Sequence, residues 1–381
     1  MVFLGLGANK VRGAILKIAI IGDTHFGYPR FFEDSFAQGE AAFLDADKKA
    51  DLILFLGDLF DARIPNLTVL GRAVSLLRKI KAPVYAIHGN HERRSRGALN
   101  PVELLGKAGL LHPLHASAAE FEKGGGKVFI AGMGNVPDDL GKKALGKFME
   151  GVKVPGGAFS VLMLHQSFSE FVYGEDLLSV SDVEELPFSL IVNGHVHARK
   201  EALGGRFLVP GGTVITQLTK EEMGPRGYIL YDTGEKKHEF VQIPCREFIF
   251  EEMEFSDASL EEVEGKVKGR LQELREGKSE AIVRVRVKGT LAKGLRPSNV
   301  QLPSGHLSFI DNRLNERLLR KEIGKIRELR EKKLGVRELT EKRLREKLGE
   351  RITLFDPFEF FEKLQEGPDA AMEYLNRKTE E

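Results

Sequence analysis

The sequence predicts an α/β fold for residues 17–244, and three observations support this prediction. Short aliphatic or β-branched runs recur at 16–22, 52–57, 83–89, 127–132, 159–165 and 188–194. The early runs are separated by stretches long enough for helices, such as 66–81. The runs are apolar almost throughout, and strands without polar alternation are buried on both faces. We therefore expect sheets that are covered by other layers.

Composition bounds the class of protein. The chain has 381 residues, which suggests two or three domains at roughly 100–200 residues each. It is 42% hydrophobic and carries 57 Lys and Arg against 56 Asp and Glu, so a wholly disordered chain and an overall basic protein are both excluded. Any affinity for polyanions must then come from local charge segregation.

Cysteine content and hydropathy indicate a protein of a reducing compartment. The one cysteine, Cys245, cannot form an intramolecular disulfide. No run approaches ~18 consecutive apolar residues, and the first 16 residues lack a basic region typical of a signal peptide. We expect a soluble, cytoplasmic protein with no membrane span, in which 1–16 is a short N-terminal extension.

The pattern of predicted strands and helices changes after Cys245. A strand is predicted over 248–255, and a helix over 259–274, because Ser259 and Glu262 form a capping-box pattern. An alternating strand follows over 281–289. We expect a small α+β domain over 245–310, a strongly charged helical linker over 311–353, and an acidic, aromatic-rich tail over 354–381.

Polar residues follow five of the predicted strands. The motifs are GDTH, GDLFD, GNHE, LMLHQS and NGHVH. One such dipeptide or histidine is usually a turn or a hydrogen-bonded surface residue. Five in succession, each at a strand end, predict side chains that converge on one rim of the sheets. The motifs supply Asp23, His25, Asp58, Asp61, Asn90, His91, His165, His195 and His197.

These residue types predict a metal centre. Nitrogen and oxygen ligands without thiolate suit Mn²⁺, Fe or Zn²⁺ better than Ca²⁺. One carboxylate can bridge two cations about 3.5–4 Å apart, which is the spacing used for in-line attack on phosphorus.

The same motif series, across residues 17–217, resembles that of the calcineurin-like metallophosphoesterases. The resemblance implies a four-layered α-β-β-α sandwich and two divalent metal ions, Mn²⁺ in the first place and Fe or Zn²⁺ as alternatives. His91 would be the catalytic residue, as general acid or phosphate donor. The resemblance assigns Asp23, His25 and His197 to the first metal, Asp58 to both, and Asn90, His165 and His195 to the second.

Within that family the chain most resembles the nuclease subunit of double-strand-break repair complexes, the SbcD-like branch. The segment 208–232, the β-α-β unit after it and the tail motif DPFEFFEKL carry this resemblance. It implies a DNA exonuclease or endonuclease, a homodimer, and an SMC-like ATPase as partner. Archaeal and eukaryotic members usually carry His at the position of Asp61, so no phosphate-positioning role is carried over to Asp61.

Two basic clusters are candidates for DNA binding. Residues 264–296 hold ten Lys or Arg against four Asp or Glu. Period-two spacing places Arg284, Arg286 and Lys288 on one face of a strand. Arg93 and Arg94 follow the GNHE motif directly. The clusters are interpreted as a phosphate-backbone surface; the alternative is a solvated outer face.

The tail predicts a short partner-binding helix. Asp356 suits the N-cap and Pro357 the first helical position. Phe358, Phe361 and Leu364 would then share one face, which would contact the partner ATPase. The alternative is that this face docks on the chain itself.

Two rival functions remain open at this stage. One is a small-substrate phosphodiesterase or phosphatase, which the metal motifs fit equally well. The other is a catalytically idle scaffold that bridges DNA and an ATPase.

Overall fold

A computed structural model describes residues 15–94, 97–303, 305–316 and 355–380. The chain divides into two compact units. The first comprises residues 1–251, 270–285 and 304–309, and the second comprises 252–269, 286–303 and 310–381. Among the described residues, no helix is long and apolar enough to cross a membrane.

The first unit is built on two six-stranded sheets, and the first sheet has the order β12-β11-β1-β2-β3-β4. Strands β1 to β4 run parallel to one another, whereas β11 is antiparallel to β1 and β12 is antiparallel to β11. The bounds are β1 (Lys17–Ile21), β2 (Leu52–Phe55), β3 (Val84–Ala86), β4 (His112–Pro113), β11 (Gly227–Asp232) and β12 (Lys237–Gln242).

The second sheet has the order β5-β6-β7-β8-β10-β9. Strands β6, β7, β8 and β10 are parallel, and the two edge strands β5 and β9 are antiparallel. The bounds are β5 (Ser117–Lys123), β6 (Gly126–Met133), β7 (Phe159–Leu164), β8 (Leu190–Asn193), β9 (Lys200–Ala202) and β10 (Phe207–Val209).

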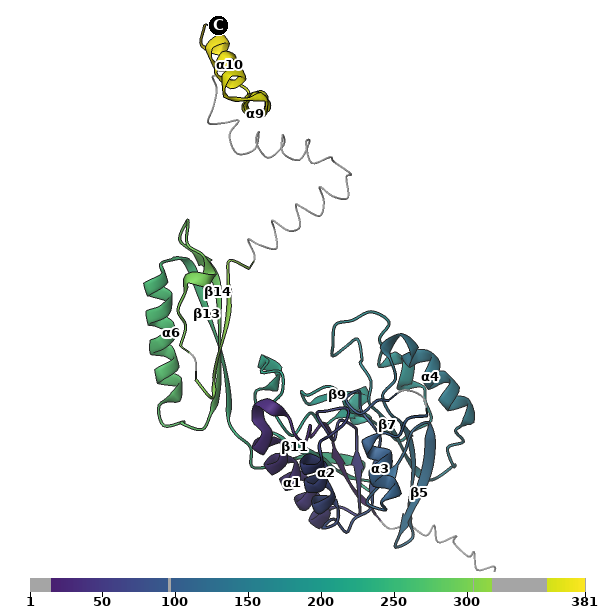
Figure 1. Cartoon of the computed structure of the whole chain (residues 1–381). Helices are drawn as coiled ribbons and strands as arrows, with labels where there is room; N and C mark the ends of the chain where they lie inside the picture. The colour runs from purple at the N-terminus through teal and green to yellow at the C-terminus, as the bar shows by residue number, and fades with distance from the viewer. Residues whose placement is uncertain (1–14, 95–96, 304, 317–354, 381) are drawn as a thin grey trace, which may run out of the picture. The chain divides into compact units, whose positions relative to one another are not determined.

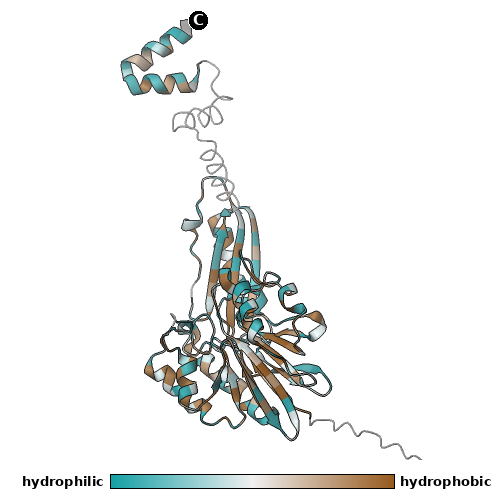
Figure 2. Cartoon of the chain, turned by 90° about the vertical axis from the view of Figure 1, so that its right-hand side faces the viewer, coloured by the Kyte–Doolittle hydropathy of each residue, from teal (hydrophilic) through white to brown (hydrophobic). Residues whose placement is uncertain are grey.

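Helices cover the outer face of each sheet, as Figure 1 shows. One apolar core fills the space between the sheets, a second lies under α1, α2 and α3, and a third lies under α4 and α5. The strands are largely hydrophobic along their length (Figure 2), as expected for strands buried on both faces. The predicted four-layered α-β-β-α sandwich is therefore confirmed. The helices are α1 (Phe32–Lys49), α2 (Leu67–Leu77), α3 (Pro101–Lys107), α4 (Asp138–Gly151) and α5 (Ser181–Glu184).

Local capping sets where two of these helices begin. The Asn66 side chain accepts a hydrogen bond from the Val69 amide at the start of α2. At α3, Asn100 and Glu103 form a capping box, and Pro101 occupies the first turn. Short 3-10 turns complete the connections: η1 (Pro29–Phe31), η2 (Leu203–Gly205), η3 (Lys220–Glu222) and η4 (Pro297–Asn299).

The segment after Cys245 forms a three-stranded sheet of order β13-β14-β15 with one helix, α6. The amide of Glu262 donates to the Ser259 hydroxyl, so α6 begins at the predicted cap. The third strand was not predicted. The bounds are β13 (Phe248–Ala258), α6 (Leu260–Arg275), β14 (Ile282–Leu291) and β15 (Ser308–Leu314).

Strand β15 corrects one prediction. Residues 311–314 were expected to open a helical linker, but they belong to β15. The segment alternates apolar and polar side chains weakly, and its strand conformation comes from its place in this sheet. The rest of the predicted linker, 317–353, and residues 1–14 of the predicted N-terminal extension lie outside the described residues.

The tail is a pair of helices, α9 (Pro357–Glu366) and α10 (Pro368–Glu380), at the yellow end of the chain in Figure 1. Asp356 caps α9 by accepting from the amides of Phe358 and Glu359, as predicted. Gly367, with φ of 136°, ends the helix. The rings of Phe355 and Phe360 lie 5.0 Å apart.

Candidate metal centre

The five predicted polar motifs all follow strands of the two sheets. Asp23 and Asp58 come just after β1 and β2, and Asn90 follows β3. On the second sheet, His165 comes directly after β7, and the NGHVH motif follows β8. Because these five strands are parallel within their sheets, their carboxyl ends form one rim, and the loops that carry the motifs meet there.

The first group of side chains consists of Asp23, His25 and His197. One ligand atom from each lies within 4.8 Å of the others. The Nε2 atoms of His25 and His197 are 3.1 Å apart, and His197 Nε2 lies 4.0 Å from Asp23 Oδ1. Both imidazoles therefore direct their Nε2 atoms toward the same place, next to the Asp23 carboxylate.

The second group consists of Asp58, His165 and His195, whose ligand atoms also lie within 4.8 Å of one another. Asn90 Oδ1 completes it, at 2.9 Å from His195 Nδ1 and 3.1 Å from His165 Nε2. His165 Nδ1 donates to the Leu56 carbonyl at 2.6 Å, which leaves Nε2 directed at the group.

Asp58 belongs to the second group and also approaches the first. Its Oδ2 is 3.4 Å from His165 Nε2 in one group and 3.9 Å from His25 Nε2 in the other. This is the position that the resemblance assigns to a carboxylate shared by two metals.

The backbone around the site is strained at the residues that carry these side chains. Asp23, His25, Asp58 and His195 have positive φ values of 49°, 44°, 52° and 72°. Side chains other than glycine rarely adopt this region, and such residues concentrate at functional sites. Gly89 passes so close to Asp58 that a Cβ there would lie 1.9 Å from Asp58 Oδ1.

The electrostatics of the site fit divalent cations. Among the described residues, the buried Oδ2 of Asp23 has no hydrogen-bond partner. Burial raises the pKa of Asp23 above its usual range despite the nearby imidazoles. Burial alone would also raise the pKa of Asp58, but His165 and His25 hold it well below its ordinary value. Two adjacent buried carboxylates, one of which has an oxygen without a donor, are stabilised by cations.

The pKa of His165 also indicates excess negative charge in the site. Burial alone would lower its pKa, but the charges of Asp58 and Asp23 raise it to about 9. The ring therefore tends to take up a second proton, on Nε2, and its positive charge then offsets the two carboxylates as a cation would.

His91 lies beside the two groups and is more accessible than their members, with 35% of its side chain exposed. Its amide donates to Asp58 Oδ1 at 2.9 Å, and its Nδ1 lies 2.5 Å from the Asp61 carbonyl oxygen. Within the described part of the chain, its Nε2 makes no hydrogen bond. Asp61 Oδ1 lies 3.4 Å from His25 Nδ1 and 3.8 Å from His91 Nδ1.

Sequence reasoning missed the residues that support this centre, most of which are buried. Glu92 accepts from the amides of Asp58, Phe60 and Gly89 and so fixes the loops after β2 and β3. Burial and the charge of Asp58 raise the pKa of Glu92 to about 8. Its place in the GNHE motif was the only available signal. The other supporting residues are Asn135, Ser167, Thr216, Glu222 and Arg226.

The predicted DNA-binding residues lie on two separate elements. Arg93 donates to Asn135 Oδ1 at 2.7 Å, and Arg94 is half-buried next to it in sequence. On β14 the three cations alternate with buried valines, as predicted. Arg286 and Lys288 pair with acidic neighbours, at 2.9 Å from Asp311 and 3.5 Å from Glu252 respectively.

The predicted partner-binding residues divide by exposure. Phe358 is buried within the tail, whereas Phe361 and Leu364 are 36% and 48% exposed. Met372 of α10 is also exposed. An apolar surface therefore remains open on the helix pair.

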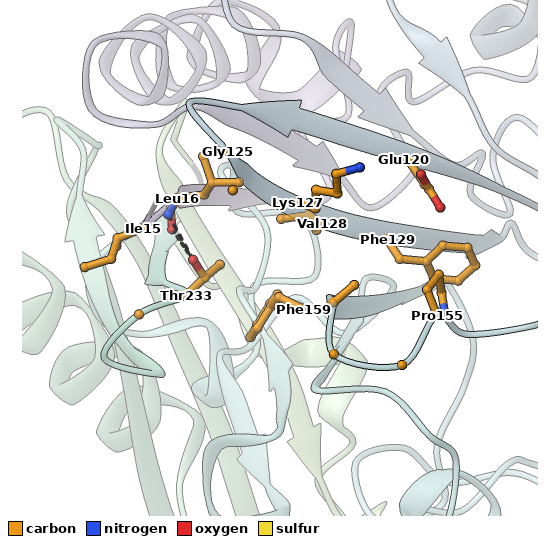
Figure 3. A pocket seen from close by; sticks show the side chains of 15 residues that line it. Ile15, Leu16, Glu120, Gly125, Lys127, Val128, Phe129, Pro155, Phe159 and Thr233 are labelled. Carbon is orange, nitrogen blue, oxygen red and sulfur yellow. Dashed lines mark hydrogen bonds between the residues drawn. The ribbon is translucent and has the colours of Figure 1, made fainter. Parts of the chain in front are cut away.

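A cavity of about 540 Å³ lies away from the metal centre, at the amino ends of β1, β6 and β7 (Figure 3). Glycine-rich turns and the Leu16–Thr233 hydrogen bonds line it. Of its lining side chains only Glu120 and Lys127 are charged, so it offers no second ligand set.

Comparison with known proteins supports the assignment of the main domain. The family model for calcineurin-like phosphoesterases matches residues 16–199. The double-strand break repair protein MRE11 of Encephalitozoon cuniculi is 28% identical over 308 residues, which cover 67% of this chain and 53% of that protein. The DNA double-strand break repair protein Mre11 of Archaeoglobus fulgidus is 28% identical over 319 residues, which cover 74% and 70%.

The chain thus spans about half the length of the first of these relatives. Among solved structures, TT1561 of Thermus thermophilus aligns with a TM-score of 0.41 at 16% identity, covering 61% of this chain and all of that one. Residues 16–199 thus match the calcineurin-like phosphoesterase model, and about two thirds or more of the chain is similar in sequence to these two Mre11 double-strand break repair proteins.

Proposed function

We propose that this chain is a metal-dependent nuclease that hydrolyses phosphodiester bonds at DNA ends during double-strand break repair. The observation that carries the proposal is the pair of ligand groups that share Asp58. The names of the relatives refer to double-strand break repair, and residues 16–199 of this chain match the phosphoesterase model.

We assign the proposed ligands to two metal ions according to the two groups described above. Asp23, His25 and His197 would hold one ion, Asn90, His165 and His195 would hold the other, and Asp58 would contact both. Bound divalent ions supply a hydroxide near neutral pH and offset the charge of the phosphodiester. Mn²⁺ is the proposed metal, with Fe or Zn²⁺ as alternatives, since all the ligand atoms are nitrogen or oxygen.

His91 is the proposed catalytic residue. Because its Nδ1 is held by the Asp61 carbonyl, Nε2 is the atom available to the substrate. In the protonated ring, Nε2 would donate its proton to the leaving oxygen or a hydrogen bond to the phosphate. The hydrogen bond from the His91 backbone amide to Asp58 Oδ1 holds the backbone of His91 next to the proposed ligands.

The proposal is tested by digestion of labelled linear duplex DNA with Mn²⁺, with and without a candidate SMC-like ATPase. Shortened strands that depend on Mn²⁺ are expected. Hydrolysis of a chromogenic diester without any effect on DNA would favour a small-substrate phosphodiesterase or phosphatase. Purified protein that binds DNA but takes up no metal would favour the idle scaffold.

The second part of the proposal concerns DNA contacts. Arg284, Arg286 and Lys288 on β14, with Arg93 and Arg94, would contact the phosphate backbone, and 245–310 would orient the DNA. Residues that contact phosphates make affinity fall with salt and carry no base specificity.

Lys288→Gln tests this surface. We expect weaker binding to duplex DNA of any sequence and a salt slope, in a plot of log K against log salt, that is smaller by about 1. Fluorescence anisotropy at several salt concentrations measures both. Lys143→Gln on α4 is the matched control, and an equal effect of the two substitutions would contradict a specific role for β14.

The third part concerns partners. We propose that the tail, through Phe361 and Leu364 on the surface left open beside the buried Phe358, binds the coiled coil of an SMC-like ATPase. A homodimer and a cytoplasmic location belong to the same proposal. If a Phe361→Ser, Leu364→Ser variant binds the ATPase as well as the wild type does, the tail is not the binding segment. If the protein sediments as a monomer, the proposed homodimer is wrong.

A further inference from the structure

The structure contains a buried network behind His197 that the proposed mechanism does not use. We propose that Glu222, acting through the Thr216 hydroxyl, is a positioning residue that fixes the ring of His197 for metal binding, while Arg226 fixes its backbone. This inference rests on the proposed function, because it assigns a role toward the metal that His197 would bind.

The contacts of the His197 ring come from both sides. On the side of the metal centre, Nε2 faces His25 at 3.1 Å. On the far side, Nδ1 lies 2.5 Å from Thr216 Oγ1 and 3.6 Å from Glu222 Oε1. The hydroxyl can accept from Nδ1–H and donate to the Glu222 carboxylate, 3.5 Å away. This arrangement places the ring proton on Nδ1 and leaves the lone pair of Nε2 for a metal.

The Glu222 carboxylate is itself held in place. One oxygen accepts from the Thr216 amide at 3.1 Å, and the other accepts from the Gln217 amide at 2.8 Å. The side chain is almost fully buried. Because both oxygens are engaged by the segment that carries the Thr216 hydroxyl, the carboxylate and the hydroxyl form one rigid unit.

Arg226 joins this unit to the backbone of the metal loop. Its Nη1 donates to the His197 carbonyl at 2.8 Å and to the Gly212 carbonyl at 3.4 Å. Its Nη2 donates to the Glu222 carbonyl at 2.5 Å. The buried Arg226 guanidinium therefore links the backbone of His197 to the backbone of Glu222.

The segment is also anchored on its other face. The Tyr28 hydroxyl donates to the Thr216 carbonyl at 2.7 Å. Arg284 Nη1 donates to the carbonyls of Gln217 and Leu218 at 3.1 and 3.0 Å. Tyr28 thus holds the backbone of Thr216, and Arg284 of β14 holds the two residues that follow it, which limits the movement of the Thr216 hydroxyl away from His197.

The physical consequence concerns metal affinity. An imidazole that can rotate, or that carries its proton on Nε2, must first be reorganised before it binds a cation. Loss of such a supporting contact typically weakens metal binding 10- to 100-fold. The proposal is specific to the group that contains His197, because the second group has its own support from Leu56 and Ser167.

Thr216→Val and Thr216→Ser in the full chain provide the test. Valine keeps the shape and removes the hydroxyl, whereas serine restores it. Mn²⁺ binding is measured by equilibrium dialysis and by electron paramagnetic resonance. We expect Thr216→Val to weaken one of two Mn²⁺ sites about 10- to 100-fold and Thr216→Ser to bind like the wild type. Glu222→Gln carries the same expectation as Thr216→Val.

Controls separate this effect from misfolding and from failure of the proposed function. Lys220→Gln changes an exposed residue of the same segment and should leave Mn²⁺ binding unchanged. Circular dichroism with chelator present checks that each variant is folded. If Thr216→Val does not fold, Glu222→Gln takes its place in the test. Two Mn²⁺ sites of wild-type affinity in a folded variant would overturn the inference, whereas a wild-type chain without Mn²⁺ would overturn the proposed function.

Discussion

His91→Ser is expected to keep its bound metal and to lose about 10²- to 10⁴-fold of the rate of Mn²⁺-dependent cleavage of linear duplex DNA. The ring is outside the two groups that share Asp58, although it forms a further cluster with His25 and Asp61, and its Nδ1 is fixed by the Asp61 carbonyl. Serine removes the proton donor at Nε2 while the amide that donates to Asp58 remains. Single-turnover cleavage and metal content of the same sample measure the two effects separately.

The matched control is His306→Ser, which removes an exposed histidine of the same compact unit. It should leave both cleavage and metal content as in the wild type. If His91→Ser cleaves DNA at the wild-type rate, His91 is not the proton donor. If it loses the metal as well, His91 supports the ligand set instead.

Asp58→Asn should abolish metal-dependent stabilisation of the chain, which is the second large effect. Asp58 is the carboxylate placed between the two groups, and an amide of the same shape has no negative charge to offset two cations. A ligand at 100 times its Kd stabilises a folded protein by about 2.7 kcal/mol. The wild type should gain that much with Mn²⁺, and Asp58→Asn should gain almost none.

Thermal unfolding with Mn²⁺ and with chelator measures this gain, and metal analysis after gel filtration measures occupancy. Asp138→Asn on α4 is the control, since it removes an exposed carboxylate outside the centre. Equal Mn²⁺ stabilisation of Asp58→Asn and the wild type would contradict a bridging role for Asp58.

Much of the fold follows from local patterns in the chain. The apolar runs became the buried strands β1, β2, β6, β7 and β8, because their hydrophobicity has no polar alternation. Ser259 and Asp356 cap the helices they were predicted to cap, since a capping hydrogen bond spans only a few residues. Strand β15 escaped prediction because its sequence, SFIDNRL, lacks an apolar run.

The metal motifs were recognisable from the chain alone, but the supporting residues were not. His25 and His197 meet at 3.1 Å although 172 positions separate them, and that contact exists only because two sheets pack face to face. By our proposal, Thr216 and Glu222 fix which ring nitrogen of His197 faces the centre, and neither belongs to one of the five metal motifs. Short-range patterns report backbone conformation and burial, whereas the orientation of a side chain is set by neighbours that are distant in sequence.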